Sequence, residues 1–333
     1  MWIKKYFGQQ HYGSSDGHGV QVDDKYIVSY QAFDPEKVPE GIKDLYIADH
    51  LGGFSKGRCR FLDNLYDKLG NRWNIVTQYL DIPYKQDFFK NLEFYYMFWG
   101  HAKDKQYPIA FRSVKHSVSC FNGAQNAGRN MTVAFLMKNH MWKKEVCSCN
   151  YLFQAEKVDG FINQLVKNEK IVRKFFITQG VWEPRGFDYQ PFNHSHNLDI
   201  LANKIRTTFL QVVTETVPNS EIPFVTEKFT YPVLNRRPFI AIAQPGWHRF
   251  ISDVMGFKLY DEIFDYSFDS ETDPVKRWMG VYTQLIKLHT LSADDLIEIL
   301  IEIKDKLDYN LDHYKSDNFM QEAINYLKNQ NNF

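Results

Sequence analysis

Three consecutive residues, Thr226, Glu227 and Lys228, place a hydroxyl, a carboxylate and an ammonium group at the start of a helical pattern. Thr226 is a predicted N-cap, so Glu227 and Lys228 fall in the first turn. We expect this helix to begin at the carboxyl edge of a parallel sheet, where open α/β sheets bind ligands. Glu215 is expected nearby. Carboxylates can accept hydrogen bonds from a ribose diol and a lysine can pair with a diphosphate, whereas the plainer interpretation is helix-dipole stabilisation and solvated surface.

Two other loops could contact phosphate. The segment from Gln244 through Gly246 to Trp247 ends a predicted strand in a Pro-Gly turn before another helix, so its backbone N–H groups could hold an anion. Arg129 follows a loop after an earlier strand, and its guanidinium could bind a phosphate through two N–H groups. The alternatives are an ordinary turn for the first loop and a surface arginine for the second.

A group-transfer reaction on a hydroxyl also needs a general base, and Asp49 and His50 are our first candidates. They end a predicted strand and precede two glycines. Asp16 and His18, in a glycine-rich segment, are the second pair. For Asp49 the competing interpretation is a structural turn residue. A metal is not required if cations and helix ends neutralise the leaving group.

Short apolar runs alternate with helical patterns along most of the chain, which predicts an α/β fold with two Rossmann-like domains. The predicted strands span residues 26–30, 45–48, 74–79, 92–99, 116–121, 145–151, 174–178, 207–213 and 238–243. The predicted helices span residues 58–69, 129–141, 155–168, 197–205, 226–235 and 246–255. A helical tail begins at Asp273-Pro274. We assign residues 1–112 to an acceptor-side domain, 113–305 to a donor domain and 306–333 to a helix that packs back on the body.

Composition narrows the class of protein. Forty basic and forty acidic side chains cancel, so no overall field favours nucleic acid or an anionic membrane. Four cysteines in 333 residues, no apolar run of membrane-spanning length and no signal-peptide pattern predict a cytoplasmic protein without membrane insertion. The P-loop, GxSxG and HExxH motifs are absent from the sequence, and His194 and His196 are interpreted as part of a polar loop rather than as metal ligands.

The segments TEKFTYPVLNRRPFIAIAQPGW and GFKLYDEIFDYSFD resemble the TEK-x-x-x-P and GF-K-x-(F/Y)-DE segments of a family of phage, viral and bacterial proteins. They are similar, more distantly, to the donor domain of α-1,3-fucosyltransferase-like glycosyltransferases of the GT-B fold, in which two Rossmann-like domains face a cleft. The resemblance covers about residues 113–277. It departs from the family at residues 124–128, where Ala-Gln-Asn-Ala-Gly replaces an Arg-Pro spacing and only Arg129 is kept.

This resemblance implies a metal-independent glycosyltransferase whose nucleotide-sugar donor, linked to UDP or GDP, is held by Glu227 at the ribose and Lys228 at the phosphates. The expected acceptor is a hydroxyl group, either of a hydroxylated base in phage DNA, which would place the protein in the host cytoplasm, or of a surface polysaccharide or a protein. The alternative is a catalytically inactive protein that keeps the fold and binds a nucleotide or a partner, which the altered loop before Arg129 favours.

Overall fold

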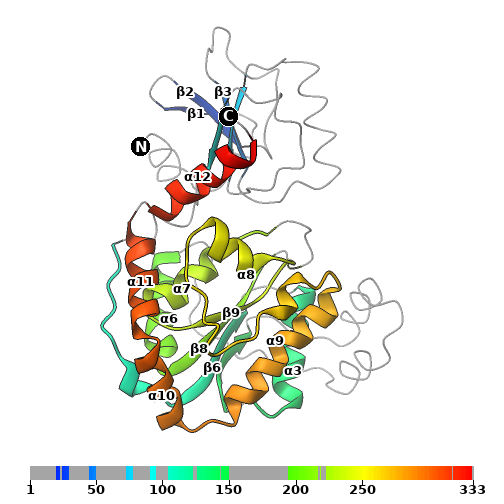
Figure 1. The fold of residues 1–333 in the computed structure, drawn as a ribbon, viewed down its shortest axis with the longest axis vertical. Coiled ribbons are helices and arrows are strands. Elements are labelled where there is room, and N and C mark those ends of the chain that lie inside the picture. The colour runs from blue at the N-terminus through cyan, green and yellow to red at the C-terminus, as the bar shows by residue number, and fades with distance from the viewer. Residues whose placement is uncertain are drawn as a thin grey trace. The chain divides into compact units, whose positions relative to one another are not determined.

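The computed structural model describes residues 20–22, 25–29, 45–49, 73–77, 91–94, 104–122, 126–142, 144–149, 194–216, 218, 223–316 and 318–331. The chain divides into two compact units. The first unit combines Met1–Gly100 with Asp317–Phe333, and the second contains His101–Ser316. Figure 1 shows the elements of each unit.

The first unit contains a five-stranded sheet in the order β1-β2-β3-β4-β5. Its strands are β1 (Val20–Val22), β2 (Lys25–Ser29), β3 (Leu45–Asp49), β4 (Trp73–Thr77) and β5 (Asn91–Phe94). The first pair is antiparallel and the other pairs are parallel. These strands confirm the four predicted in this region, whereas the predicted helix at 58–69 lies outside the described residues. Helix α12 (Asn318–Asn331) belongs to this unit and contacts β5.

Strand order separates the two units. In the first unit the strands follow one another in sequence order, without the reversal that defines a doubly wound sheet. The second unit has a four-stranded parallel sheet in the order β7-β6-β8-β9, in which the order does reverse. The prediction of two Rossmann-like domains therefore holds for at most one, the second unit.

The second unit follows the predicted alternation closely. Its strands and the helices between them are β6 (His116–Asn122), α3 (Ala127–Lys138), β7 (Val146–Cys149), α6 (His194–Ile205), β8 (Thr208–Thr214), η5 (Glu227–Phe229), α7 (Thr230–Leu234) and β9 (Phe239–Ile242). The predicted helix and strand at 155–178 lie outside the described residues. The helix α6 begins at His194, three residues before the predicted start, so His194 and His196 are helical rather than part of a loop.

Helices cover both faces of this sheet (Figure 1). Side chains alternate between faces along a strand, so Phe239 and Ile242 of β9 point in opposite directions. The Phe239 ring packs edge-to-face on the rings of Phe229 and Trp247. On the other face, Ile242 lies against α3 at Gly128, where an added Cβ would come within 3.0 Å of the isoleucine side chain. Every residue of β8 and β9 is buried, as expected for a parallel sheet covered on both faces.

The turn after β9 leads into two short helical segments, α8 (Trp247–Arg249) and η6 (Phe250–Val254), the second of which has π-helical hydrogen bonds. The 3-10 segment η7 (Ser267–Ser270) follows. Three helices then end the unit, α9 (Pro274–His289), α10 (Ala293–Glu302) and α11 (Lys304–Lys315). The predicted start of α9 is confirmed, because the Asp273 side chain accepts hydrogen bonds from the first-turn N–H groups and Pro274 occupies the first position.

Candidate functional site

The reversal of strand order in the second unit falls between β6 and β8. From β6 the chain runs to β7 on one side, and from β8 it runs to β9 on the other. The loops at the carboxyl ends of β6 and β8 therefore diverge, and this is where open α/β sheets form a ligand-binding crevice. Side chains tie the two loops together. Thr214 donates a hydrogen bond of 2.9 Å to Asn122, and the Asn126 amide donates to the backbone oxygens of Glu215 and Thr216 at 3.0 and 3.2 Å.

Arg129 lies in the first turn of α3, directly at this crevice. Its backbone N–H donates to the Asn126 side chain at 2.9 Å, so Asn126 caps the helix. Arg129 is 4% exposed, and its guanidinium donates to the Thr214 carbonyl oxygen at 3.3 and 3.4 Å and to the Thr216 hydroxyl at 3.4 Å. The structure therefore holds a positive charge beside the positive end of the helix dipole.

Lys228 brings a second cation to the same place from the opposite side. Thr226 has extended backbone and its hydroxyl accepts from the Lys228 N–H, which confirms the predicted N-cap. The Lys228 ammonium lies 2.9 Å from the Glu227 carboxylate, 3.3 Å from the Thr226 hydroxyl and 3.4 Å from the Thr216 hydroxyl. The Glu227 and Lys228 side chains are 17% and 14% exposed.

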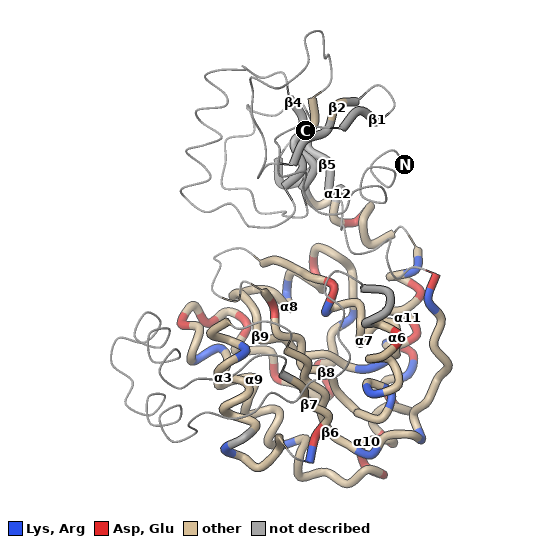
Figure 2. Tube along the Cα trace, turned by 180° about the vertical axis from the view of Figure 1, so that it is seen from behind, with Lys and Arg blue, Asp and Glu red and all other residues tan. Residues whose placement is uncertain are grey.

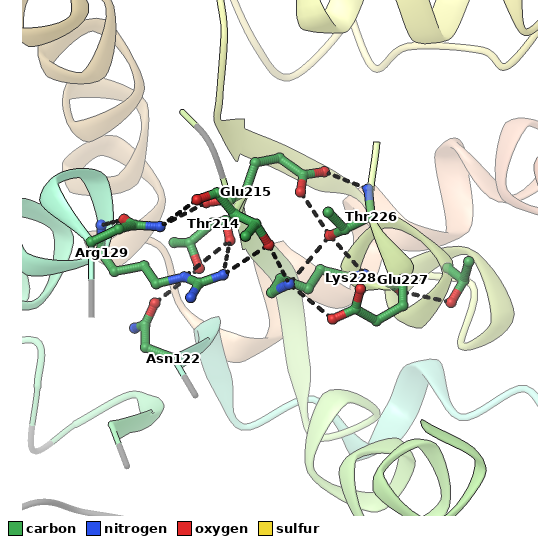
Figure 3. Close-up of polar contacts among 10 residues, drawn as sticks. Asn122, Arg129, Thr214, Glu215, Thr226, Glu227 and Lys228 are labelled. Atoms are coloured by element: carbon green, nitrogen blue, oxygen red, sulfur yellow. Dashed lines mark hydrogen bonds and ion pairs between the residues drawn. The ribbon is translucent and has the colours of Figure 1, made fainter. Parts of the chain in front are cut away.

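We call Arg129, Thr216, Glu227 and Lys228 the anion site. Figure 3 shows the polar contacts of its labelled members Arg129, Glu227 and Lys228. The Thr216 hydroxyl is within 3.4 Å of a nitrogen of each cation, so the two nitrogens are at most twice that distance apart. Two unit charges so placed repel by about 2–3 kcal/mol at an effective dielectric constant of about 20. One carboxylate, that of Glu227, pairs with Lys228. An anion bound close to both cations would reduce this repulsion.

Glu215 is brought to this cluster, but its carboxylate faces into the protein. The residue is fully buried, and its two oxygens accept from the Thr226 N–H at 3.1 Å and from the Thr226 hydroxyl at 2.7 Å. Burial raises the pKa of the Glu215 carboxyl, while the nearby Lys228 charge and the hydrogen bonds from Thr226 act in the opposite direction. This geometry makes Glu215 a residue that positions Thr226 and, through it, the first turn that carries Lys228.

The turn from Gln244 to Gly246 has its hydrogen bonds satisfied within the protein. Gly246 has a left-handed backbone, φ +72°, and its N–H donates to the Asp269 carbonyl oxygen at 2.7 Å. The next N–H, of Trp247, donates to the Gln244 carbonyl oxygen, and those of His248 and Arg249 donate to the Asp269 carboxylate at 3.1 and 3.0 Å. A phosphate could use these N–H groups only by displacing Asp269.

Gln244 is likewise internal. Its side chain is fully buried and accepts a hydrogen bond of 3.3 Å from the Phe224 N–H, which precedes the N-cap Thr226 by two residues. Glu215 lies just after β8 and Gln244 just after β9. Both therefore hydrogen-bond to the segment that leads into the anion site, at Thr226 and Phe224. This second layer supports the geometry of Lys228 without facing a ligand.

The predicted bases belong to the first unit. Asp49 is the last residue of β3, as predicted for the end of a strand. Its side chain, together with His50, Asp16 and His18, lies outside the described residues. Among the residues that the structure does describe, no group of three or more histidine, cysteine, aspartate or glutamate side chains is arranged to hold a metal ion.

Asn126 and Thr216 are the site residues that sequence reasoning missed. Asn126 precedes a helical stretch as a capping residue should, so its position was a usable signal. Thr216 carries no such signal, because its role depends on two cations that lie far from it in the sequence and only the fold brings together.

Comparison of the chain with protein-family models, with curated proteins and with solved structures finds no match. Within the described part of the chain, no helix combines the length and the apolar character needed to cross a bilayer. Acidic and basic residues are interspersed along the second unit rather than gathered by sign (Figure 2). The geometry of the anion site is therefore the basis for assigning a function.

Proposed function

We propose that the protein is a glycosyltransferase that binds a nucleotide-sugar donor at the anion site. One observation carries the proposal: Arg129 and Lys228 approach the same Thr216 hydroxyl, at 3.4 Å each, where the strand order reverses. A diphosphate is a multiply charged anion of the size that two such cations can share. The N-terminal end of α3 adds a favourable dipole on the same side.

The neighbouring residues have distinct roles in this proposal. Lys228 exchanges part of its contact with Glu227 for a phosphate oxygen when the donor arrives. The Glu227 carboxylate then accepts hydrogen bonds from the ribose hydroxyls. Glu215 and Gln244 hold the turn in place from behind. Because the two cations stabilise the charge that develops on the leaving diphosphate, the transfer needs no metal ion.

The first unit is proposed to bind the acceptor and to supply the general base. Asp49 or His50 removes the proton from the acceptor hydroxyl as that oxygen attacks the anomeric carbon and the nucleoside diphosphate leaves. A hydroxylated base in DNA, a polysaccharide and a protein are the candidate acceptors. An enzyme acting on DNA would have to expose or flip the base before transfer.

Calorimetric titration of the full chain with UDP, GDP, ADP and CMP, and with their sugar conjugates, tests the donor site. We expect saturable binding of one nucleotide that persists in EDTA. Lys228→Met should weaken it about 10- to 100-fold, because a desolvated charge-assisted contact contributes about 1.5–3 kcal/mol.

Lys276→Met is the matched control, since Lys276 is exposed on α9 and has no part in the anion site. The nucleotide affinity of Lys276→Met should equal that of the unmodified protein. Equal nucleotide affinity in a folded Lys228→Met variant would refute the assignment of the anion site.

A nucleotide-binding protein without transferase activity is the second candidate. The observation that favours it is that all four residues of the anion site belong to the second unit, so nucleotide binding does not require the acceptor side. Incubating the protein with the nucleotide sugar that binds, and measuring release of the free nucleotide, separates the two. Release that is lost in Asp49→Asn or in His50→Gln, with donor affinity unchanged, supports the transferase.

A further inference from the structure

A cavity of about 520 Å³ lies at the carboxyl end of β9, which is an edge strand of the second sheet. Its walls come from the turn after β9, from α8 and η6, and from η7. The volume falls within the range of small-molecule sites, about 300–1,000 Å³. Among the described residues that line it, none belongs to the anion site. The cavity is therefore a separate candidate site.

The charges in the cavity do not suit a phosphate. Its lining includes one arginine, Arg249, and two aspartates, Asp253 and Asp269. Arg249 is 81% exposed at its side chain and lies 3.9 Å from Asp253, so its charge is already partly matched. Asp269 remains as an excess negative charge on the wall, and it occupies the backbone N–H groups that an anion would otherwise use.

Asp269 provides a fixed acceptor instead. The side chain is 10% exposed. One oxygen accepts from the His248 ring at 2.7 Å and the other from the Arg249 N–H at 3.0 Å. Burial alone would raise the pKa of Asp269, but the hydrogen bonds from His248 and Arg249 outweigh it and lower that pKa. The carboxylate is therefore ionised at neutral pH, and with about four lone pairs it can also accept from a ligand hydroxyl.

The rest of the wall combines hydroxyl groups with apolar surface. Ser252, Ser267 and Ser270 also line the cavity. The Ser270 hydroxyl donates to the Ser267 carbonyl oxygen and the Ser267 hydroxyl bonds to Asp265, so both hydroxyl oxygens can still accept from a ligand. Tyr266 and Leu259 contribute an aromatic ring and an aliphatic side chain. A sugar ring has the same two kinds of surface, a rim of hydroxyls and faces of slightly positive C–H groups that pack well on the negative face of an aromatic ring.

We propose that this cavity binds a neutral saccharide. The carboxylate of Asp269 and the serine hydroxyls fix the orientation of the sugar hydroxyls, and the Tyr266 and Leu259 side chains cover its apolar face. The cavity does so whether or not the anion site holds a nucleotide, because the two sites share no described residue.

Ligand-observed saturation-transfer NMR on the full chain tests this with glucose, galactose, mannose, fucose, N-acetylglucosamine and N-acetylgalactosamine at millimolar concentrations. We expect at least one of them to give a saturable signal. Ser252→Trp and Ser270→Trp, which fill the cavity from two different walls, should each weaken that binding at least about tenfold. Circular dichroism and thermal unfolding verify that each variant is folded, and the two replacements make the test independent of either one.

Glu298→Trp is the matched control, because it adds the same side chain at an exposed position of α10 outside the cavity. It should leave saccharide binding unchanged, as should Lys228→Met. The proposal is overturned if no saccharide of the set binds. It is overturned too if both cavity variants bind the saccharide as tightly as the unmodified protein. It is also overturned if these variants lose UDP or GDP binding instead, since the cavity would then be part of the nucleotide site. Loss of nucleotide binding in Lys228→Met alone concerns only the proposed function.

Discussion

Two regions at the carboxyl edge of the same sheet carry opposite charges. At the loops that follow β6 and β8, the cations Arg129 and Lys228 converge on one threonine hydroxyl. At the turn that follows β9, Asp269 places a carboxylate against the first N–H groups of the next helical segment. The first region thus brings two cations together, whereas in the second a carboxylate of the protein occupies the N–H groups.

Position at the carboxyl edge of the sheet therefore does not by itself determine which charge a loop presents to a ligand. Both loops follow a buried strand and precede a helical segment, and both were candidates on that basis. The deciding feature is the charge that the fold brings to each region, which is two cations at the first and a carboxylate at the second.

The largest effect is expected for Asp269→Asn. The amide cannot accept from both the His248 ring and the Arg249 N–H, so a buried donor loses its partner and the variant should lose about 2–4 kcal/mol of unfolding free energy. Urea denaturation at neutral pH measures this change. A loss below about 0.5 kcal/mol would show that the carboxylate is not needed to complete this turn.

The effect of Asp269→Asn on the unfolding free energy should also depend on pH. The folded-state pKa of Asp269 is lowered, so its stabilising contribution is fully present above the unfolded-state pKa, about 3.9, and is lost as the pH falls through the lower folded-state pKa. Unfolding free energies measured across acidic pH should therefore converge for the unmodified protein and Asp269→Asn.

A moderate effect is expected for Gly246→Ala. An added Cβ meets no atom within 4 Å, but the backbone at φ +72° disfavours any side chain. The cost should be about 1 kcal/mol from backbone strain. At Gly128 the limit is space rather than backbone conformation, since the Cβ of Gly128→Ala would lie 3.0 Å from Ile242 and 3.1 Å from Pro218. Thermal unfolding of the two variants compares them, and a Gly246→Ala variant as stable as the unmodified protein would contradict the strain argument.

The smallest effect at neutral pH is expected for Glu215→Gln. The amide oxygen has two lone pairs and can accept from both the Thr226 N–H and the Thr226 hydroxyl, so the turn keeps both contacts and stability should change by less than about 1 kcal/mol. Because the folded-state pKa of Glu215 is raised, the unmodified protein loses stability as the pH rises from about 4.3 through that raised value. Glu215→Gln should lack this slope in unfolding experiments, and an identical slope would contradict it.

Much of the second unit could be predicted because its signals are local. Buried strands, the cap at Thr226 and the start of α9 at Asp273-Pro274 all depend on residues within one turn or one strand of each other. The reversal of strand order could only be inferred from the alternation of elements. In the first unit the same alternation suggested a second doubly wound sheet, but parallel strands in sequence order produce the same pattern along the chain.

The sequence by itself determined most of the described strands, the helix caps at Thr226 and Asp273, and the presence of Arg129 and Lys228 in first turns. Only the tertiary structure decided which charges meet. Glu215 was expected to face a ligand, and the fold instead turns its carboxylate inward to Thr226. Asp269 reaches back across twenty residues to Arg249. Hydrogen-bond partners this far apart in sequence depend on where the fold places each side chain, and local pattern does not carry that information.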